Sequence, residues 1–154
     1  MKNFLIVHHS PSDNTRRLVS AMAEAAEDMS SAQSLTVTTI EALQCQPEHV
    51  LQADALLLMT PENLGYMSGG MKDFFDRIYY PCLEEKQGLP ISALIRAGTD
   101  GTGTHRALMS ITTGLKWRWV QEAIILRGNW QPEFLNKADE LAGAMVCALD
   151  QGII

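Results

Sequence analysis

The chain has 154 residues, of which 46% are hydrophobic and 19% are charged. This composition is typical of a globular protein and not of a disordered chain, and the length predicts a single domain over residues 1–154. The net charge of −6 argues against nucleic acid as a partner, because binding to a phosphate backbone requires a basic surface. The longest wholly apolar run, 144–149, is too short to span a membrane. Residues 1–10 lack the apolar stretch of a signal peptide. We therefore expect a cytoplasmic protein without membrane contact.

The first predicted element is a strand over 4–7, an unbroken apolar run of the kind found in strands that are buried on both faces. Residues 10–14 are rich in turn and N-cap residues and lead into a helix. In that helix Leu18, Met22 and Ala26 recur at helical spacing, which predicts one apolar face directed at a core.

Alternation of apolar residues with threonine predicts a second strand over 35–40, nearer an edge of the sheet. Residues 41–53 have only weak helical periodicity, and we expect a loop with a short helix there. A second unbroken apolar strand is predicted over 55–59, ended by Pro61, and a helix over 68–80.

The second half of the chain continues the alternation of strand and helix. A strand is predicted over 91–97, a glycine-rich loop over 98–103 and a helix over 104–114. The last strand is expected over 123–126, and the last helix begins near Pro132. Five strands that alternate with helices predict an α/β fold in which one parallel sheet is covered on both faces, a three-layer α/β/α sandwich.

Ligands of open parallel sheets bind beyond the carboxyl ends of the strands, and three predicted loops at this edge carry small polar residues or glycine. In the first loop, the side chains of Ser10, Ser12, Asn14 and Thr15 precede a helix whose N-terminus can hold a phosphate. Cations in the first turn oppose the helix dipole, so Arg16 and Arg17 are more easily explained if an anion lies nearby. The alternative is that these residues only cap the helix.

The other two loops offer surfaces of a different kind. The second, 60–68, combines polar side chains at Glu62 and Asn63 with apolar surface at Leu64 and Tyr66, a mixture suited to an aromatic heterocycle with polar edges. The third, 98–103, has three glycines and can pass close to a ligand. Its glycine spacing is neither that of a dinucleotide fingerprint nor that of a Walker loop.

The segment TPENLGYMSGGMKDFFDR, residues 60–77, resembles the flavin loop and following helix of NAD(P)H-dependent FMN reductases and quinone reductases in the flavodoxin superfamily. Residues 10–15, Ser-x-Ser-x-Asn-Thr, resemble the phosphate loop of flavodoxins. The resemblance extends in order over nearly the whole chain. It implies a flavodoxin-like sheet of order 2-1-3-4-5 and a non-covalently bound FMN.

The resemblance also implies which residues contact FMN. They are Ser10, Ser12, Asp13, Asn14 and Thr15 around the phosphate, Pro61, Glu62, Asn63, Leu64, Gly65 and Tyr66 along the isoalloxazine, and Thr99, Asp100, Gly101, Thr102 and Gly103 on its pyrimidine side. Flavodoxins usually have glycine where this chain has Asp13. Its carboxylate is therefore expected either to point away and cap the helix or to weaken FMN binding.

The function implied is an oxidoreductase that passes electrons from NAD(P)H through FMN to a quinone or similar acceptor. No catalytic side chain is expected, because the flavin supplies the redox chemistry. Two alternatives remain: a flavodoxin-type carrier that serves a redox protein and has no NAD(P)H activity, and an interaction module without a cofactor.

Metal and disulfide sites are not expected. His8 and His9 are neighbours in a strand and point to opposite faces, and the three cysteines are far apart in the sequence. Asp73 and Arg77 are predicted to form a surface pair at i,i+4. The aromatic residues in 74–80 are more than one helix face can bury, so we expect some of them either in the core or in a homodimer contact.

Overall fold

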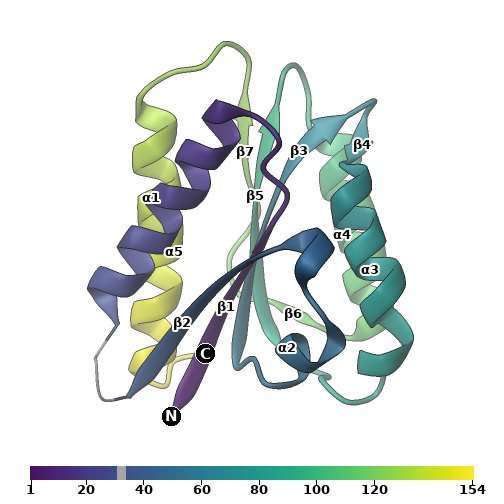
Figure 1. The fold of residues 1–154 in the computed structure, drawn as a ribbon, viewed down its shortest axis with the longest axis vertical. Coiled ribbons are helices and arrows are strands. Elements are labelled where there is room, and N and C mark those ends of the chain that lie inside the picture. The colour runs from purple at the N-terminus through teal and green to yellow at the C-terminus, as the bar shows by residue number, and fades with distance from the viewer. Residues whose placement is uncertain (31–33) are drawn as a thin grey trace.

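The structure, a computed structural model, describes residues 1–30 and 34–154 (Figure 1). The strands and helices are β1 (Lys2–His8), α1 (Asp13–Met29), β2 (Leu35–Glu41), a 3₁₀ turn η1 (Ala42–Gln44), α2 (Pro47–Leu51), β3 (Ala55–Asn63), β4 (Tyr66–Met67), α3 (Gly69–Cys82), β5 (Pro90–Ala97), α4 (Thr102–Leu115), β6 (Arg118–Trp119), β7 (Ile124–Arg127) and α5 (Glu133–Asp150).

The sheet has the order β2-β1-β3-β5-β6, and all of these neighbours pair in parallel. The fifth position is shared, since β6 pairs with the start of β5, at Pro90 and Ile91, and β7 pairs with its end, over 94–97. The predicted three-layer α/β sandwich and its order 2-1-3-4-5 are confirmed, with β6 and β7 together in the place of one fifth strand. This order puts the carboxyl ends of β1, β3 and β5 side by side at one edge.

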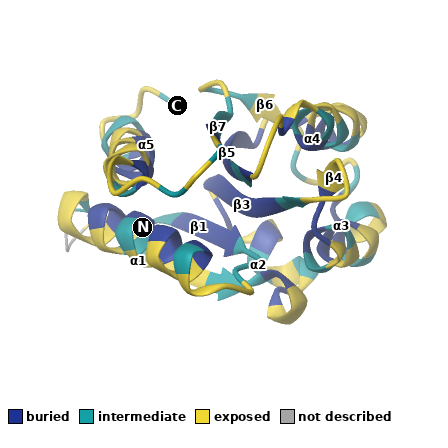
Figure 2. Cartoon of the chain, turned by 90° about the horizontal axis from the view of Figure 1, so that it is seen from above, coloured by how far each residue is buried: buried dark blue, intermediate teal, exposed yellow. Residues whose placement is uncertain are grey.

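Helices cover both faces of this sheet. α1 and α5 pack on one face, and α3 and α4 on the other, as Figure 1 and the view from above in Figure 2 show. The alternation of side chains along a strand divides the apolar run of β1 between the two layers, with Phe4 and Ile6 against α1 and α5 and with Leu5 and Val7 on the opposite face. This division explains why the strands read as unbroken apolar runs.

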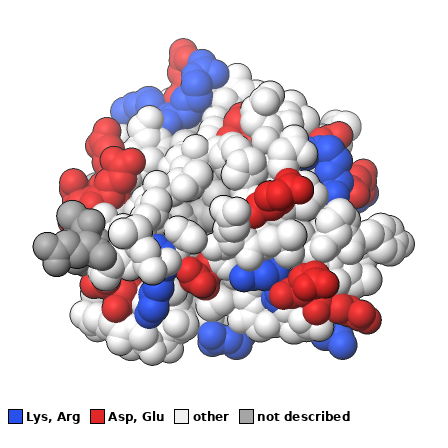
Figure 3. Space-filling view, turned by 60° about the horizontal axis from the view of Figure 1, so that its bottom comes forward, with Lys and Arg blue, Asp and Glu red and all other residues white. Residues whose placement is uncertain are grey.

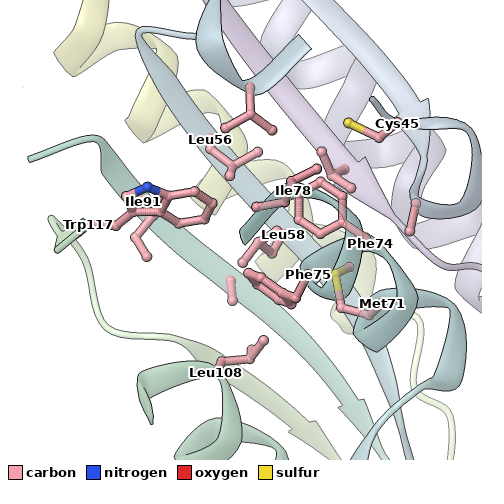
Figure 4. Packing of buried hydrophobic residues seen from close by; sticks show 14 of the residues in the cluster. Cys45, Leu56, Leu58, Met71, Phe74, Phe75, Ile78, Ile91, Leu108 and Trp117 are labelled. Atoms are coloured by element: carbon pink, nitrogen blue, oxygen red, sulfur yellow. The ribbon is translucent and has the colours of Figure 1, made fainter. Parts of the chain in front are cut away.

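The aromatic residues of α3 have separate environments. Phe74 and Phe75 are buried, in edge-to-face contact at 5.1 Å, and pack with Leu58, Met71 and other residues in the core shown in Figure 4. Tyr80 lies outside this core and is 79% exposed. The core assignment therefore holds for the two phenylalanines, and the homodimer contact stays a prediction.

The end of β3 differs from the prediction. β3 does not end at Pro61 but continues to Asn63 and turns back into β4, with Glu62 opposite Met67 and Asn63 opposite Tyr66. The carbonyl of Met59 accepts a hydrogen bond from the β1 side, and alternate residues of a strand face the same neighbour. An N–H at position 61 would therefore point to the same side, where β1 has already ended. Because no strand lies there to accept it, proline at this position removes no hydrogen bond from the sheet.

Helix boundaries follow their caps. The Ser68 hydroxyl accepts a hydrogen bond from the N–H of Met71, so α3 begins where the sequence predicts, but it continues two residues further, to Cys82. α4 begins at Thr102, two residues before the predicted start, because Gly101 has the left-handed φ of 78° that turns the chain into the helix.

Charges of both signs are interspersed on the face of the molecule in Figure 3, which brings the lower end of Figure 1 forward. Within the described ranges, the helices include none with the length and apolar character needed to cross a membrane.

Candidate functional site

The three predicted loops lie at the carboxyl edge of the sheet, and specific contacts connect the second with the third. The carboxylate of Glu62, in the β3–β4 hairpin, accepts a hydrogen bond of 2.6 Å from the N–H of Gly101, in the β5–α4 loop. The carbonyl oxygen of Gly65 in the same hairpin lies so close to Gly103 that a Cβ there would be 2.1 Å from it. The hairpin and the β5–α4 loop therefore hold each other in place.

The phosphate loop is fixed by a reciprocal cap at the start of α1. The Ser12 hydroxyl accepts from the N–H of Thr15 at 3.1 Å, and the Thr15 hydroxyl accepts from the N–H of Ser12 at 3.0 Å. The N–H groups of Asp13 and Asn14 donate to no other group of the described residues. Two free N–H groups thus lie at the positive end of a 17-residue helix, an arrangement that binds phosphate.

Asp13 points away from this cradle. Its carboxylate pairs with Arg16, one turn further along α1, and its side chain is 93% exposed. The sequence led us to expect that Asp13 either points away and caps the helix or weakens FMN binding. The carboxylate does point away, but Ser12 and not Asp13 caps the helix. The pair with Arg16 orients the carboxylate into solvent, where water screens its charge.

Both histidines of the β1 end support the phosphate loop. His8 Nδ1 lies 2.9 Å from the Ser10 hydroxyl, and burial lowers the pKa of His8, although Glu41 opposes this effect. The imidazole of His9 packs on the backbone of Gly70, where a Cβ would be 2.6 Å from the ring. The loop after β1 is thereby joined to the start of α3, a contact that nothing in the sequence pattern indicated.

The β3–β4 hairpin has a two-residue turn in which Leu64 and Gly65 both have positive φ, 54° and 76°. Two positive φ values are the signature of a type I′ turn, which matches the twist of a hairpin, and leucine is unusual in it. Leu64 is fully exposed, and Tyr66 beside it is 39% exposed. The tip of the hairpin thus presents apolar and aromatic surface to solvent at the carboxyl edge of the sheet.

The β5–α4 loop is exposed at Thr99 and Asp100 and buried at Gly101. The Thr102 hydroxyl donates to the Asp100 carboxylate, and Arg127 Nε donates to the Asp100 carbonyl at 2.5 Å. Arg127 ends β7, so the loop is also tied to the last strand of the sheet.

An FMN would fit this edge in two respects. The free N–H groups of Asp13 and Asn14, with the Ser10 and Ser12 hydroxyls, match the needs of a phosphate. The exposed hairpin tip and the exposed part of the β5–α4 loop offer the apolar and polar surface that a flavin ring requires. The individual contacts assigned to residues 10–15, 61–66 and 99–103 stay predictions.

One hollow touches the three loops only at Asp13. It measures about 540 Å³ and is lined by Asp13, Arg16, Arg17, Ser20, Ala21, Glu24 and Leu135, on α1 and the start of α5. A hollow of about 250 Å³ lies between α4 and the β6–β7 link. The flavin site is therefore inferred from loop geometry and hydrogen-bonding capacity and not from cavity size.

Comparisons with known proteins identify the family and the fold of the chain. Residues 44–131, more than half of the chain, match the NADPH-dependent FMN reductase family. A flavodoxin from Aquifex aeolicus is 31% identical over 115 residues, which are 75% of this chain and 60% of that protein. The chain thus spans less than two thirds of that relative's length.

Solved structures show the same fold. The rubredoxin:oxygen oxidoreductase of Desulfovibrio gigas superposes with a TM-score of 0.80 at 15% identity, over 99% of this chain and 37% of that one. A WrbA-like flavodoxin from Agrobacterium tumefaciens superposes with a TM-score of 0.75 at 19% identity, over 99% of both chains. With its flavodoxin-like fold and this family match, the chain belongs to the NADPH-dependent FMN reductase family.

Proposed function

We propose that this protein binds FMN at the carboxyl edge of its sheet and is an NAD(P)H-dependent oxidoreductase that reduces a quinone or a similar small acceptor. The observation that carries the proposal is the cradle of two free N–H groups and two serine hydroxyls at the start of α1, beside an exposed apolar hairpin. When bound, FMN supplies the redox chemistry, in which NAD(P)H, a proton and the quinone give NAD(P)⁺ and the hydroquinone.

The chain's own residues bind and orient the cofactor in this proposal. The α1 N-terminus and the Ser10 and Ser12 hydroxyls hold the phosphate. Leu64 and Tyr66 cover apolar ring surface, and the bond from the Gly101 N–H to Glu62 keeps the hairpin at a fixed position relative to the β5–α4 loop. No side chain is required to transfer a proton.

Carboxylates near the ring are expected to affect its reduction potential. Asp100 is exposed in the β5–α4 loop, and a negative charge there disfavours an anionic reduced flavin. Asp100→Asn is therefore expected to raise the reduction potential of the bound FMN. An unchanged potential, measured by equilibration with a reference dye, would exclude this role for Asp100.

The proposal is tested by following NADPH oxidation at 340 nm with FMN-loaded protein and a quinone. We expect turnover that needs both FMN and quinone. Omission of the quinone, and free FMN at the same concentration without protein, are the controls. The absence of turnover by protein that demonstrably holds FMN would contradict the reductase assignment.

A flavodoxin-type electron carrier is the second candidate, favoured by the 31% identity to a flavodoxin. A carrier is expected to hold FMN and to accept electrons from a reductase protein, but not directly from NADPH. The net charge of −6 is modest for a protein that docks electrostatically, and together with the family match it favours the reductase. The NADPH assay separates the two.

A further inference from the structure

Two arginines contact one indole ring beside the phosphate loop. The guanidinium carbon of Arg17 lies 5.1 Å from the centroid of the Trp130 ring, and that of Arg96 lies 6.0 Å from it. Arg96 also lies 5.0 Å from the ring of Phe134. Arg17 is three residues beyond Asn14 in α1, and Trp130 lies in the loop from β7 to α5, which passes close to the start of α1 at the top of Figure 1.

The guanidinium of Arg96 is hydrogen-bonded to three backbone carbonyls. Its guanidinium donates to the carbonyl oxygens of Ala97 at 2.7 Å, Leu126 at 3.0 Å and Gly128 at 2.7 Å. No carboxylate within the described ranges pairs with it, and burial lowers its pKa. Arg96 thus places a positive charge under Trp130 that only carbonyl dipoles compensate.

Arg17 is exposed, and its donors are free. Within residues 1–30 and 34–154, neither a hydrogen bond nor an ion pair engages its guanidinium, in contrast to Arg16, which pairs with Asp13. Contact with the indole face orients the guanidinium without using its N–H groups. A fork of oriented, unoccupied donors is suited to a phosphate, which arginine binds through two parallel hydrogen bonds, and Arg96 adds a second positive charge at the same indole.

Resting on the function proposed above, we propose that the Arg17–Trp130–Arg96 cluster binds the 2′-phosphate of the electron donor and makes the protein prefer NADPH over NADH. Arg17 makes the contact, and Trp130 and Arg96 are positioning residues. The cluster shares the carboxyl edge with the phosphate loop, so one dinucleotide can approach both the flavin site and this corner.

The hollow next to Arg17 has room for the adenosine half of the donor. It measures about 540 Å³ and offers Ser20 as a polar group and Ala21 and Leu135 as apolar surface. Two carboxylates also line it. Asp13 is paired with Arg16, and Glu24 is seven residues from Arg17, about 10 Å further along the helix axis.

The first test compares Arg17→Gln with Arg106→Gln in the full chain loaded with FMN. Arg106 is an exposed arginine of α4, on the opposite face of the sheet, so the control makes the same change of charge. For Arg17→Gln we expect the KM for NADPH to rise about tenfold, the loss of a charge-assisted contact, with kcat and the KM for NADH unchanged. Arg17→Lys, which keeps the charge but not the fork, should lie between.

A second test measures binding without turnover. Calorimetric titration of the protein with 2′,5′-ADP and with 5′-AMP is expected to show tighter binding of the 2′-phosphate nucleotide, a difference that Arg17→Gln abolishes and Arg106→Gln preserves. Equal affinity for the two nucleotides, or an equal loss of NADPH and NADH in the kinetic test, would overturn the proposal. Binding of polyglutamate in place of either nucleotide would also overturn it, in favour of an acidic protein partner.

The two proposals fail in different ways. If neither dinucleotide reduces the bound FMN while 2′,5′-ADP still binds through Arg17, the reductase assignment is wrong and the phosphate site stands. If NADPH and NADH are oxidised with the same KM, the reductase assignment stands and the specificity assignment is wrong.

Discussion

Gly69 and Gly70 are adjacent in the first turn of α3 but have different surroundings. A Cβ at Gly69 would meet no atom within 4 Å, whereas a Cβ at Gly70 would be 2.6 Å from the His9 ring. Gly70 therefore allows His9, just before the loop at 10–15, to pack on α3, the helix that follows the β3–β4 hairpin. This contact couples two parts of the proposed cofactor site.

Gly70→Ala is expected to destabilise the protein by about 1–3 kcal/mol, because the imidazole must move, and to weaken FMN binding by displacing the phosphate loop. Gly69→Ala is the matched control and should not destabilise the protein, because a Cβ at this first helical position meets no other atom. Urea unfolding and FMN titration measure the two effects. The double variant His9→Ala, Gly70→Ala should regain part of the stability lost in Gly70→Ala. If it does not, the contact between His9 and residue 70 is not the cause of that loss.

The close approach of Gly65 and Gly103 makes a second prediction at this scale. A Cβ at position 103 would be 2.1 Å from the Gly65 carbonyl oxygen, while one at Gly98 would meet nothing within 4 Å. Gly103→Ala should therefore move the hairpin and weaken FMN binding at least tenfold, a loss of about 1.4 kcal/mol, and Gly98→Ala should not. Equal Kd values for the two variants would show that the hairpin does not depend on this contact.

Among the elements, α3 and η1 are held together by one side chain. Arg77 donates to the Asp73 carboxylate at 2.6 Å, as the predicted surface pair, and also to the carbonyls of Cys45 at 2.5 Å and Ala42 at 2.6 Å. The sequence predicted the first contact from the i,i+4 spacing. It could not predict the other two, because they join residues more than 30 positions apart.

Arg77→Ala is expected to lower the free energy of unfolding by about 2–3 kcal/mol, since two carbonyls lose a charged donor. Lys72→Ala removes the exposed pair with Asp76 on the same helix and should cost less than about 0.5 kcal/mol. Equal effects of the two substitutions in urea unfolding would mean that the carbonyl contacts add nothing.

The elements that the sequence predicted well are those with a strong local pattern. The apolar runs at 4–7, 55–59 and 91–97 all lie in strands that the structure confirms. A strand that is buried on both faces is mostly apolar along its whole length, so a short apolar run is enough to indicate it. The sequence did not predict the hairpin of β3 and β4. A proline ends a strand only where a neighbouring strand needs its N–H, and the sequence does not show which neighbour lies there. The division of the fifth strand into β6 and β7 likewise depends on pairing with β5.

For the molecule as a whole, two buried thiols affect the stability at high pH. Burial raises the pKa of Cys45 to about 12 and that of Cys82 to about 11, from an ordinary value of 9.0. Above pH 9 the unfolded chain releases thiol protons that the folded chain keeps, so the unfolded state gains stability as the pH rises. Below pH 9 both states hold these protons and no such dependence arises.

The thermal unfolding temperature is therefore expected to be insensitive to these thiols between pH 7 and 8.5 and to fall from pH 9 to 11. Cys45→Ala should reduce the slope of that fall, although it lowers the starting stability by removing a buried side chain. An identical slope in the wild type and the variant would exclude Cys45 as a cause.

The sequence predicted where the three loops lie but not the contacts between residues around them, and the binding of FMN by these loops stays a prediction. The three loops were placed correctly because the carboxyl ends of neighbouring parallel strands share one edge. The bond between Gly101 and Glu62, the packing of His9 on Gly70 and the role of Arg96 were not predicted, because each joins residues distant in the sequence.

The most direct test of the central claim is a titration of FMN with the purified protein, followed by flavin fluorescence. We expect saturable quenching at micromolar concentrations with one FMN per chain. Quenching should be weaker for Ser12→Ala, which loses the helix cap and the phosphate contact proposed for its hydroxyl, than for Thr99→Ala. Fluorescence that stays unquenched up to high micromolar protein would contradict the assignment of this edge as a flavin site.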